Sequence, residues 1–403
     1  MCKNRKIKVL RIITRLNIGG PAIHTILLAD GINKDLFTTH LIAGKPDASE
    51  GEMLDLAASR GVDVQFIQEL GREIGFNDFY AFFAILRVIW KVKPDIIHTH
   101  TAKAGTLGRL AAFIAGVPVK VHTFHGHVFE GYFSPGKAKF FIILERILSR
   151  FTDRVITVSE SVKGQIIEKL GMSLNNKCSV VKLGLDLSDF LDNHKLKGSL
   201  RKELGIDEGT LLVGIVGRLV PIKNHAMFLN AIRQVLDSVP NCLARFVIVG
   251  DGELRATLES EVKRLKLENH VIFTGWIRDI AKVYADLDVV TLTSLNEGTP
   301  VSIIEAMASA RPVIVTSVGG VIDMISNEEN GILVKSNDSE AFAEKVIELL
   351  KDKNKRQRLG NAGRQFVRSN FNKDRLVRDI EDLYHDCLNE KTGYKQFGGQ
   401  NKS

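Results

Sequence analysis

Short runs of β-branched residues alternate with helical segments along almost the whole chain, and this alternation constrains the fold more than any other feature. In the first half, seven runs predict strands, at residues 7–14, 39–44, 62–67, 95–100, 119–124, 154–159 and 178–183. The helices predicted between them include residues 21–33, 77–91, 103–115, 136–151 and 161–170. Strands that alternate with helices form βαβ units and parallel sheets. The chain is therefore predicted to have an α/β fold.

The pattern restarts after a polar stretch at residues 184–199, which is predicted to be irregular. Six more strands are predicted at residues 210–217, 244–250, 271–275, 288–293, 312–316 and 331–334, and three helical segments follow, the last at about 373–388. We expect two Rossmann-like domains, one over residues 1–187, completed by the last helix at about 373–389, and one over residues 195–372. The polar tail at residues 390–403 is predicted to be disordered.

Composition excludes several classes of protein. The apolar runs are broken well short of the ~18 residues that a membrane span needs, and the basic N-terminus lacks the features of a signal peptide. Four scattered cysteines without a C-x-x-C pair indicate neither a disulfide framework nor a zinc site. We therefore expect a cytoplasmic protein.

The net charge of +8 lies entirely in the first half of the chain. Through Asp186 there are 25 basic and 17 acidic residues, and the remainder is balanced at 30 of each. Such an excess is consistent with an anionic partner: nucleic acid, a phosphorylated substrate or a membrane surface. A solvated basic surface without a partner is the alternative.

Three glycine-bearing loops are candidates for binding, because ligands of open parallel sheets bind outside the carboxyl ends of the strands. The first contains Gly19 and Gly20, and it is not the G-x-G-x-x-G of nicotinamide-cofactor proteins. In the second, Arg218 and Lys223 lie beside a helix N-terminus, as a diphosphate requires. The third contains Gly250. A plain strand–helix turn and two solvated loop cations remain the alternatives.

Glu305 is the only charged residue in an apolar helix predicted to begin at Thr299 and Pro300. A carboxylate in such a helix is costly unless donors meet it, and these donors are either protein groups or ligand hydroxyls. Glu297 lies in the loop just before the helix. Two carboxylates beside one anion-attracting helix tip suggest a ligand with both phosphate and hydroxyl groups, such as a nucleotide sugar.

Two histidine clusters end strands of the first half, at residues 98–100 and 122–127. Histidines at this spacing can bind a metal ion, with Glu130 or Asp153 as a candidate carboxylate ligand. We favour one or two histidines that contact a sugar, and we predict no metal site. The D-x-D at residues 286–288 lies at the amino end of its strand and is rejected as a metal site.

The ordered motifs resemble the retaining glycosyltransferases of family 4, which have the GT-B fold. The motifs are G-R-x4-K ending at Lys223, V-G-D-G at residues 249–252 and E-x7-E from Glu297 to Glu305. The loop at Gly19 and residues 123–134 resemble the first domain of bacterial members that build surface polysaccharides. The resemblance covers residues 7 to about 385.

The resemblance implies two Rossmann-like domains whose parallel sheets face each other across a cleft. It also implies transfer of a sugar from a UDP- or GDP-sugar to a lipid-linked or small hydroxylated acceptor. The anomeric configuration would be retained, and neither a metal nor another cofactor would be required. The basic first domain would dock on an anionic membrane, as a peripheral protein on the inner face of the plasma membrane.

The same resemblance implies roles for individual residues. Arg218 and Lys223 would bind the donor diphosphate, and Glu305 would accept hydrogen bonds from the ribose. Glu297 would meet the donor sugar, and His125 would lie near the reacting carbon, so His125, Arg218, Lys223 and Glu297 form the predicted catalytic set. The remaining predicted donor-binding positions are Gly19, Gly20, Gly217, Gly250, Trp276, Ile277, Arg278, Gly298, Thr299, Pro300 and Val301.

Three alternatives to a transferase remain. A sugar-nucleotide epimerase would share the two-domain architecture, and a metal-dependent hydrolase would use the histidine clusters. A non-catalytic nucleotide or nucleic-acid binder is the third, but the basic half lacks the interleaved aromatic residues of an RNA-binding sheet. We therefore expect no nucleic-acid partner.

Overall fold

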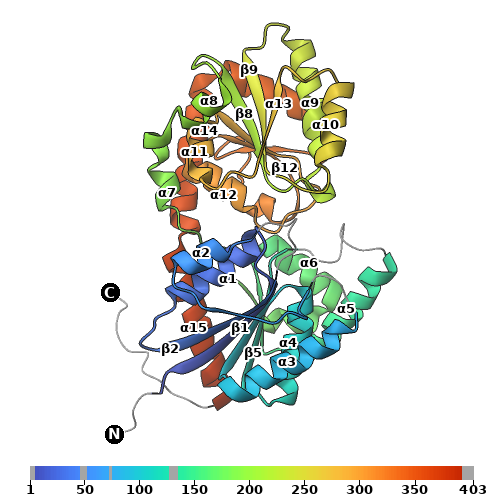
Figure 1. Ribbon diagram of the computed structural model, residues 1–403, viewed down its shortest axis with the longest axis vertical. Helices are drawn as coiled ribbons and strands as arrows, with labels where there is room; N and C mark the ends of the chain where they lie inside the picture. Colours follow the sequence, from blue (N-terminus) through green and yellow to red (C-terminus); the bar gives the residue numbers. More distant parts are fainter. Residues whose placement is uncertain (1–4, 46–51, 72–74, 127–134, 393–403) are drawn as a thin grey trace. The chain divides into compact units, whose positions relative to one another are not determined.

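The computed structural model describes residues 5–45, 52–71, 75–126 and 135–392, and the chain divides into two compact units (Figure 1). The first unit is Met1–Leu185 with Lys373–Ser403, and the second is Asp186–Asn372. Each unit contains one parallel sheet with helices on both faces.

The first unit has a seven-stranded sheet in the order β3-β2-β1-β4-β5-β6-β7, and every neighbouring pair is parallel. The strands are β1 (Ile7–Arg15), β2 (Phe37–Gly44), β3 (Val64–Phe66), β4 (Ile96–His100), β5 (Val119–Phe124), β6 (Arg154–Thr157) and β7 (Cys178–Val180). The helices are α1 (Gly20–Gly31), α2 (Leu54–Ser59), α3 (Asn77–Val92), α4 (Ala102–Ile114), α5 (Pro135–Arg150), α6 (Glu160–Leu170), the 3-10 helix η1 (Met172–Lys177) and α15 (Lys373–Thr392). All seven predicted strands are present, and the two edge strands are shorter than predicted.

Side chains alternate between the two faces of this sheet, as strand geometry requires. Val9, Ile96 and Val121 pack against α1 and α15, whereas Leu10 and Ile97 pack against α3 and α4. Because both faces are buried, the strands read as nearly continuous apolar runs, which made them visible in the sequence.

A buried polar network ties the last helix to the first unit. Arg11 Nη1 donates to the Tyr384 hydroxyl of α15 at 2.6 Å, and that hydroxyl is 2.6 Å from His98 Nδ1. The other ring nitrogen of His98 is 2.7 Å from the Thr123 hydroxyl. Because unpaired polar groups in a core are costly, this network fixes α15 on the sheet.

The second unit has a six-stranded parallel sheet in the order β10-β9-β8-β11-β12-β13. The strands are β8 (Leu211–Val216), β9 (Ala244–Val249), β10 (Val271–Gly275), β11 (Val289–Leu292), β12 (Val313–Thr316) and β13 (Ile332–Val334). The helices are α7 (Ser188–Leu191), α8 (Ser199–Leu204), α9 (His225–Ser238), α10 (Arg255–Arg264), α11 (Ile280–Asp286), α12 (Val301–Ala308), α13 (Ser339–Lys351) and α14 (Lys353–Asn370), with 3-10 helices η2 (Asn193–Leu196), η3 (Pro221–Lys223) and η4 (Gly319–Asp323). The predicted strands and the three C-terminal helices are all present.

The polar stretch at residues 184–199 is more regular than predicted. It forms the short helices α7 and η2, and Asn193 donates a 2.9 Å hydrogen bond to the Ser309 hydroxyl of the second unit. At the other end of the chain, α15 continues to Thr392, so residues 390–392 are helical rather than part of the tail. The rest of the predicted tail lies outside the described residues. None of the described helices is both long enough and apolar enough to cross a membrane.

Candidate functional site

Loops of the second unit meet at the carboxyl edge of its sheet, where parallel sheets bind ligands. Backbone hydrogen bonds of 2.9 Å run from Gly217 N–H to the Val249 carbonyl, from Leu219 N–H to Asp251 and from Gly250 N–H to Gly275. The loops after β8, β9 and β10 therefore form one connected surface.

Two glycines allow the close approach of these loops. Gly250 has φ +132°, and a Cβ there would lie 2.0 Å from the Gly217 carbonyl oxygen. Gly319 has φ +48°, and a Cβ there would lie 1.9 Å from the Glu297 carbonyl oxygen. Sequence reasoning missed Gly319, although the glycine pair that follows β12 was a signal of close backbone approach.

The two predicted diphosphate ligands, Arg218 and Lys223, lie in the loop between β8 and α9. Lys223 Nζ is 2.5 Å from Glu297 Oε1, and the Ser294 hydroxyl donates to the same oxygen at 2.6 Å. The half-buried Arg218 guanidinium has no hydrogen-bond or ion-pair partner within the described ranges. With two cations and one carboxylate, this group keeps a net positive charge, as binding of an anion requires. Ser294 is a further polar residue that the sequence did not single out.

Helix α12 points its first turn at the same edge of the sheet. It begins at Val301, one residue later than predicted, because Pro300 occupies the N-cap position without a capping side chain. The N–H groups of Val301 and Ser302 have no partner inside the helix, as at any helix start. Gly298 and Thr299 lead into this turn, and the part of these backbone groups in donor binding stays a prediction.

Glu305 lies one helical turn further along, on the same face as Val301. The hydroxyl of Tyr284, a fully buried residue of α11, donates to Glu305 Oε2 at 3.0 Å. Burial raises the pKa of Glu305 to about 7, and the hydrogen bond from Tyr284 partly offsets this effect. Tyr284 is a protein partner that periodicity alone did not reveal.

The predicted donor-binding residues Trp276, Ile277 and Arg278, whose backbone the family resemblance places near the base, directly follow β10 and lie at the same edge. The D-x-D does not. Asp286 accepts hydrogen bonds from the backbone N–H groups of Gly198 and Arg201 at 2.5 and 3.0 Å, and Asp288 pairs with Arg201 at 2.8 Å. Both aspartates therefore already have bonding partners within the protein.

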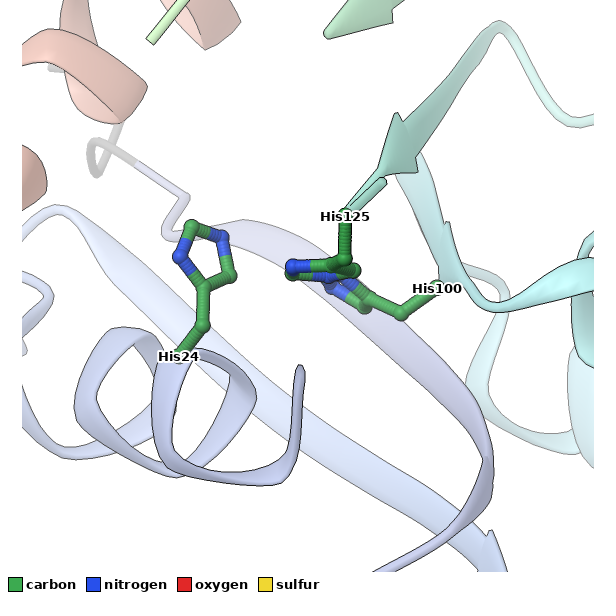
Figure 2. A group of neighbouring side chains, drawn as sticks. All are labelled: His24, His100 and His125. Carbon is green, nitrogen blue, oxygen red and sulfur yellow. The ribbon is translucent and has the colours of Figure 1, made fainter. Parts of the chain in front are cut away.

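The predicted site residues of the first unit lie at the carboxyl edge of their own sheet. Gly19 precedes α1, which begins at Gly20. His125 follows β5, and its Nε2 is 3.0 Å from Nδ1 of His100. His24, on α1, faces both rings and was missed because a lone histidine on an apolar helix carries no metal-site pattern (Figure 2).

Of the two candidate carboxylate ligands, Asp153 does not complete a metal site with these histidines. Asp153 accepts a hydrogen bond from the backbone N–H of Lys120 and pairs with Lys391, before β6 begins. It therefore lies at the amino end of the sheet. Glu130 and the rest of residues 127–134 lie outside the described residues.

Two family models match the chain: Glycosyltransferase Family 4 over residues 18–189 and Glycosyl transferases group 1 over residues 197–366. The UDP-Gal:alpha-D-GlcNAc-diphosphoundecaprenol alpha-1,3-galactosyltransferase of Escherichia coli is 33% identical over 331 residues, which cover 81% of this chain and 84% of that protein. The capsular polysaccharide biosynthesis glycosyltransferase CapM of Staphylococcus aureus is 28% identical over 82% of this chain and 87% of its own length.

The fold agrees with these matches. Anabaena Alr3699/HepE, solved in complex with UDP-glucose, superposes with a TM-score of 0.80 over 94% of this chain and 100% of its own, at 22% identity. Two Rossmann-like units, matched in order by the two family models, constitute the predicted GT-B fold. The chain therefore belongs to the family 4 glycosyltransferases.

Proposed function

We propose that this glycosyltransferase moves a sugar from a UDP- or GDP-sugar to a hydroxyl group of a lipid-linked or small acceptor, with retention of configuration. The observation that carries the proposal is the group of Arg218, Lys223, Glu297 and Glu305 around the first turn of α12. The E. coli relative is a galactosyltransferase named for UDP-Gal and a diphosphoundecaprenol acceptor, and HepE binds UDP and UDP-glucose. Assembly of a surface polysaccharide or glycolipid is the corresponding role.

The charges at this site suit a leaving diphosphate better than acid–base catalysis by protein carboxylates. Arg218, Lys223 and the first turn of α12 would stabilise the negative charge that develops as the sugar–oxygen bond breaks. Each charge-assisted hydrogen bond contributes roughly 1.5–3 kcal/mol. The departing diphosphate then accepts the acceptor's proton on the same face of the sugar, so neither a strong protein base nor a metal ion is required.

The carboxylates would hold the donor. Glu305 has one oxygen bonded to Tyr284, and its other oxygen would accept ribose hydroxyls. When a diphosphate draws Lys223 away, Glu297 keeps its hydrogen bond from Ser294 and becomes free to accept hydroxyls of the sugar. The parts of His125, Gly19 and Gly20 in donor binding stay predictions.

Mass spectrometry of nucleoside diphosphate release tests the proposal. The wild-type protein, supplied with sugar donors and a broad acceptor extract, should release nucleoside diphosphate, and Arg218→Ala should abolish this release. Arg233→Ala is the matched control, because Arg233 pairs with an exposed aspartate on α9. No release with any donor would refute the proposal.

The same assay separates the alternatives. An epimerase would change the donor sugar without any acceptor, and a metal-dependent hydrolase would lose activity with a chelator. We expect turnover to need an acceptor and to persist in EDTA.

A surface of the first unit fits the proposed membrane contact. Helices α3, α4 and α5 lie side by side (Figure 1) and expose large apolar side chains. The exposed fraction is 63% for Tyr80 and 58% for Trp90 on α3, 55% for Ile114 on α4 and 61% for Phe140 on α5. Exposed basic residues of α3 and α5 are Arg87, Lys91, Lys139, Arg146 and Arg150. Aromatic residues mixed with cations on amphipathic helices are typical of binding to anionic bilayer surfaces.

Flotation with liposomes tests this contact. The protein should float with anionic vesicles and much less with zwitterionic ones, and the double variant Trp90→Ser/Phe140→Ser should lose most of this binding. Leu243→Ser, which changes a 76% exposed apolar residue of the second unit, should behave as the wild type. Equal loss in both variants would argue against the surface.

A further inference from the structure

Three histidines from separate elements of the first unit meet at the carboxyl edge of its sheet. His24 comes from α1, His100 ends β4 and His125 follows β5, and their side chains point toward one another (Figure 2). One ring nitrogen of each lies within 4.8 Å of the other two. Ligand nitrogens of a tetrahedral zinc site, with bonds of 2.0–2.1 Å, lie about 3.3 Å apart. Small side-chain rotations would therefore bring this histidine triad around one ion.

Most ring nitrogens of the triad lack a hydrogen-bond partner among the described protein atoms. These are both nitrogens of His24, Nε2 of His100 and Nδ1 of His125. His24 is only 1% exposed and His100 is fully buried. A buried polar atom without a hydrogen-bond partner destabilises the folded state. The remaining two nitrogens of the triad, His100 Nδ1 and His125 Nε2, are 3.0 Å apart and bond to each other. Other buried histidines of this sheet are bonded to threonine hydroxyls, so among the described histidines of the first unit the unpaired buried nitrogens lie in the triad.

The chemistry of the triad selects the kind of ligand. A histidine of ordinary pKa is mostly neutral at pH 7, and each neutral ring offers a lone pair to a metal ion. The group contains no carboxylate, and the nearby charges on Arg11 and Arg375 are positive. Mg²⁺ and Ca²⁺ need oxygen ligands, whereas Zn²⁺, Cu²⁺ and Ni²⁺ accept imidazole.

We propose that His24, His100 and His125 bind one late first-row transition-metal ion, such as Zn²⁺. An oxygen of solvent or of a bound molecule completes the coordination, as in other three-histidine zinc sites. The transfer chemistry proposed above needs no metal, and His125 belongs to both the triad and the predicted catalytic set. An ion there would occupy the ring of His125, so it would restrain the residue that the family resemblance places near the donor sugar.

Titration of the full-length, chelator-treated protein with Co²⁺ tests the proposal without an activity measurement. One Co²⁺ per chain should bind with the intense visible absorption of tetrahedral coordination. Zn²⁺ should displace it, and excess Mg²⁺ should not. Native mass spectrometry gives the stoichiometry.

Two variants and one control complete the test. His24→Ala and His100→Gln should each weaken Co²⁺ binding by at least about 10–100-fold, since loss of even a hydrogen-bond partner of a ligand has that effect. His40→Ala, which removes an exposed histidine of the same unit, should bind as the wild type. Circular dichroism of the metal-free variants checks their fold. Unchanged affinity in the folded triad variants, or only a weak octahedral spectrum in the wild type, would overturn the proposal.

Discussion

The burial of Glu305 should make the stability of the second unit depend on pH. Burial raises the pKa of this carboxyl from 4.5 to about 7 in the folded chain. The folded state therefore holds the proton more tightly than the unfolded state, and stability falls as pH rises from 4.5 to 7. A shift of about 2.5 pKa units, at 1.36 kcal/mol per unit, sets an upper limit of about 3 kcal/mol.

The substitution Glu305→Gln isolates this effect, because glutamine has nearly the same shape and stays neutral at every pH. The free energy of unfolding of the wild type minus that of the variant should fall by up to about 3 kcal/mol between about pH 4.5 and 8. Hydrogen exchange of β11 and α12, compared between the two proteins at the same pH, measures this difference with intrinsic exchange rates cancelled. Glu268→Gln, at an exposed position of the same unit, is the control.

A second substitution tests the direction of the pKa shift of Glu305. The hydrogen bond from Tyr284 favours the ionised form of Glu305, so Tyr284→Phe should move the pH transition upward. Ribose hydroxyls of a bound nucleotide should do the opposite, and UDP should bind more tightly as pH rises through 7. A difference between wild type and Glu305→Gln that does not change with pH would refute the assignment of a buried, pKa-shifted carboxyl.

Three further predictions concern single contacts. Arg218→Ala should weaken UDP binding about 10–150-fold by calorimetry, since it removes roughly 1.5–3 kcal/mol. Gly250→Ala should destabilise the second unit in thermal melting and weaken nucleotide binding, because its Cβ would lie 2.0 Å from a carbonyl oxygen of the neighbouring loop, whereas Gly209→Ala, with nothing within 4 Å, should do neither. Arg109→Met should cost about 3–5 kcal/mol in denaturant unfolding, because it leaves the buried Glu145 unpaired, and replacing both partners with methionine should restore most of that loss.

The sequence was sufficient to predict the strands that are buried on both faces and the loops that follow them. Strands covered on both faces must be apolar along their length, so β1, β8 and β9 were visible as runs. The loops that follow these strands could be predicted as binding loops, because they contain glycines such as Gly250 at the carboxyl end of a strand, where parallel sheets bind ligands. Position along the chain was therefore enough to group Arg218, Lys223 and the residues near α12.

The partners of these residues could not be predicted, because they depend on which side chains meet in three dimensions. Tyr284 reaches Glu305 from a different helix, and its spacing in the sequence reads only as a core position. His24 likewise faces His100 and His125 only because α1, which packs on β1 and β2, brings this side chain to the residues that end β4 and follow β5. The glycine pair at Gly319 was a signal that the sequence offered. Its close approach to the Glu297 backbone could not be predicted, because the spacing of the two residues in the sequence does not indicate a contact.

The pairing of Lys223 with Glu297 explains how one site can serve both the phosphate and the sugar. Their side chains are 19% and 12% exposed, so the ion pair is largely buried and Lys223 needs another charged partner when it leaves Glu297. In the proposed function, a diphosphate would replace Glu297 as the partner of Lys223, while Ser294 would still satisfy one oxygen of Glu297. Donor binding would thus free the carboxylate for sugar hydroxyls only when the phosphate is in place. The two recognition events would thereby be coupled.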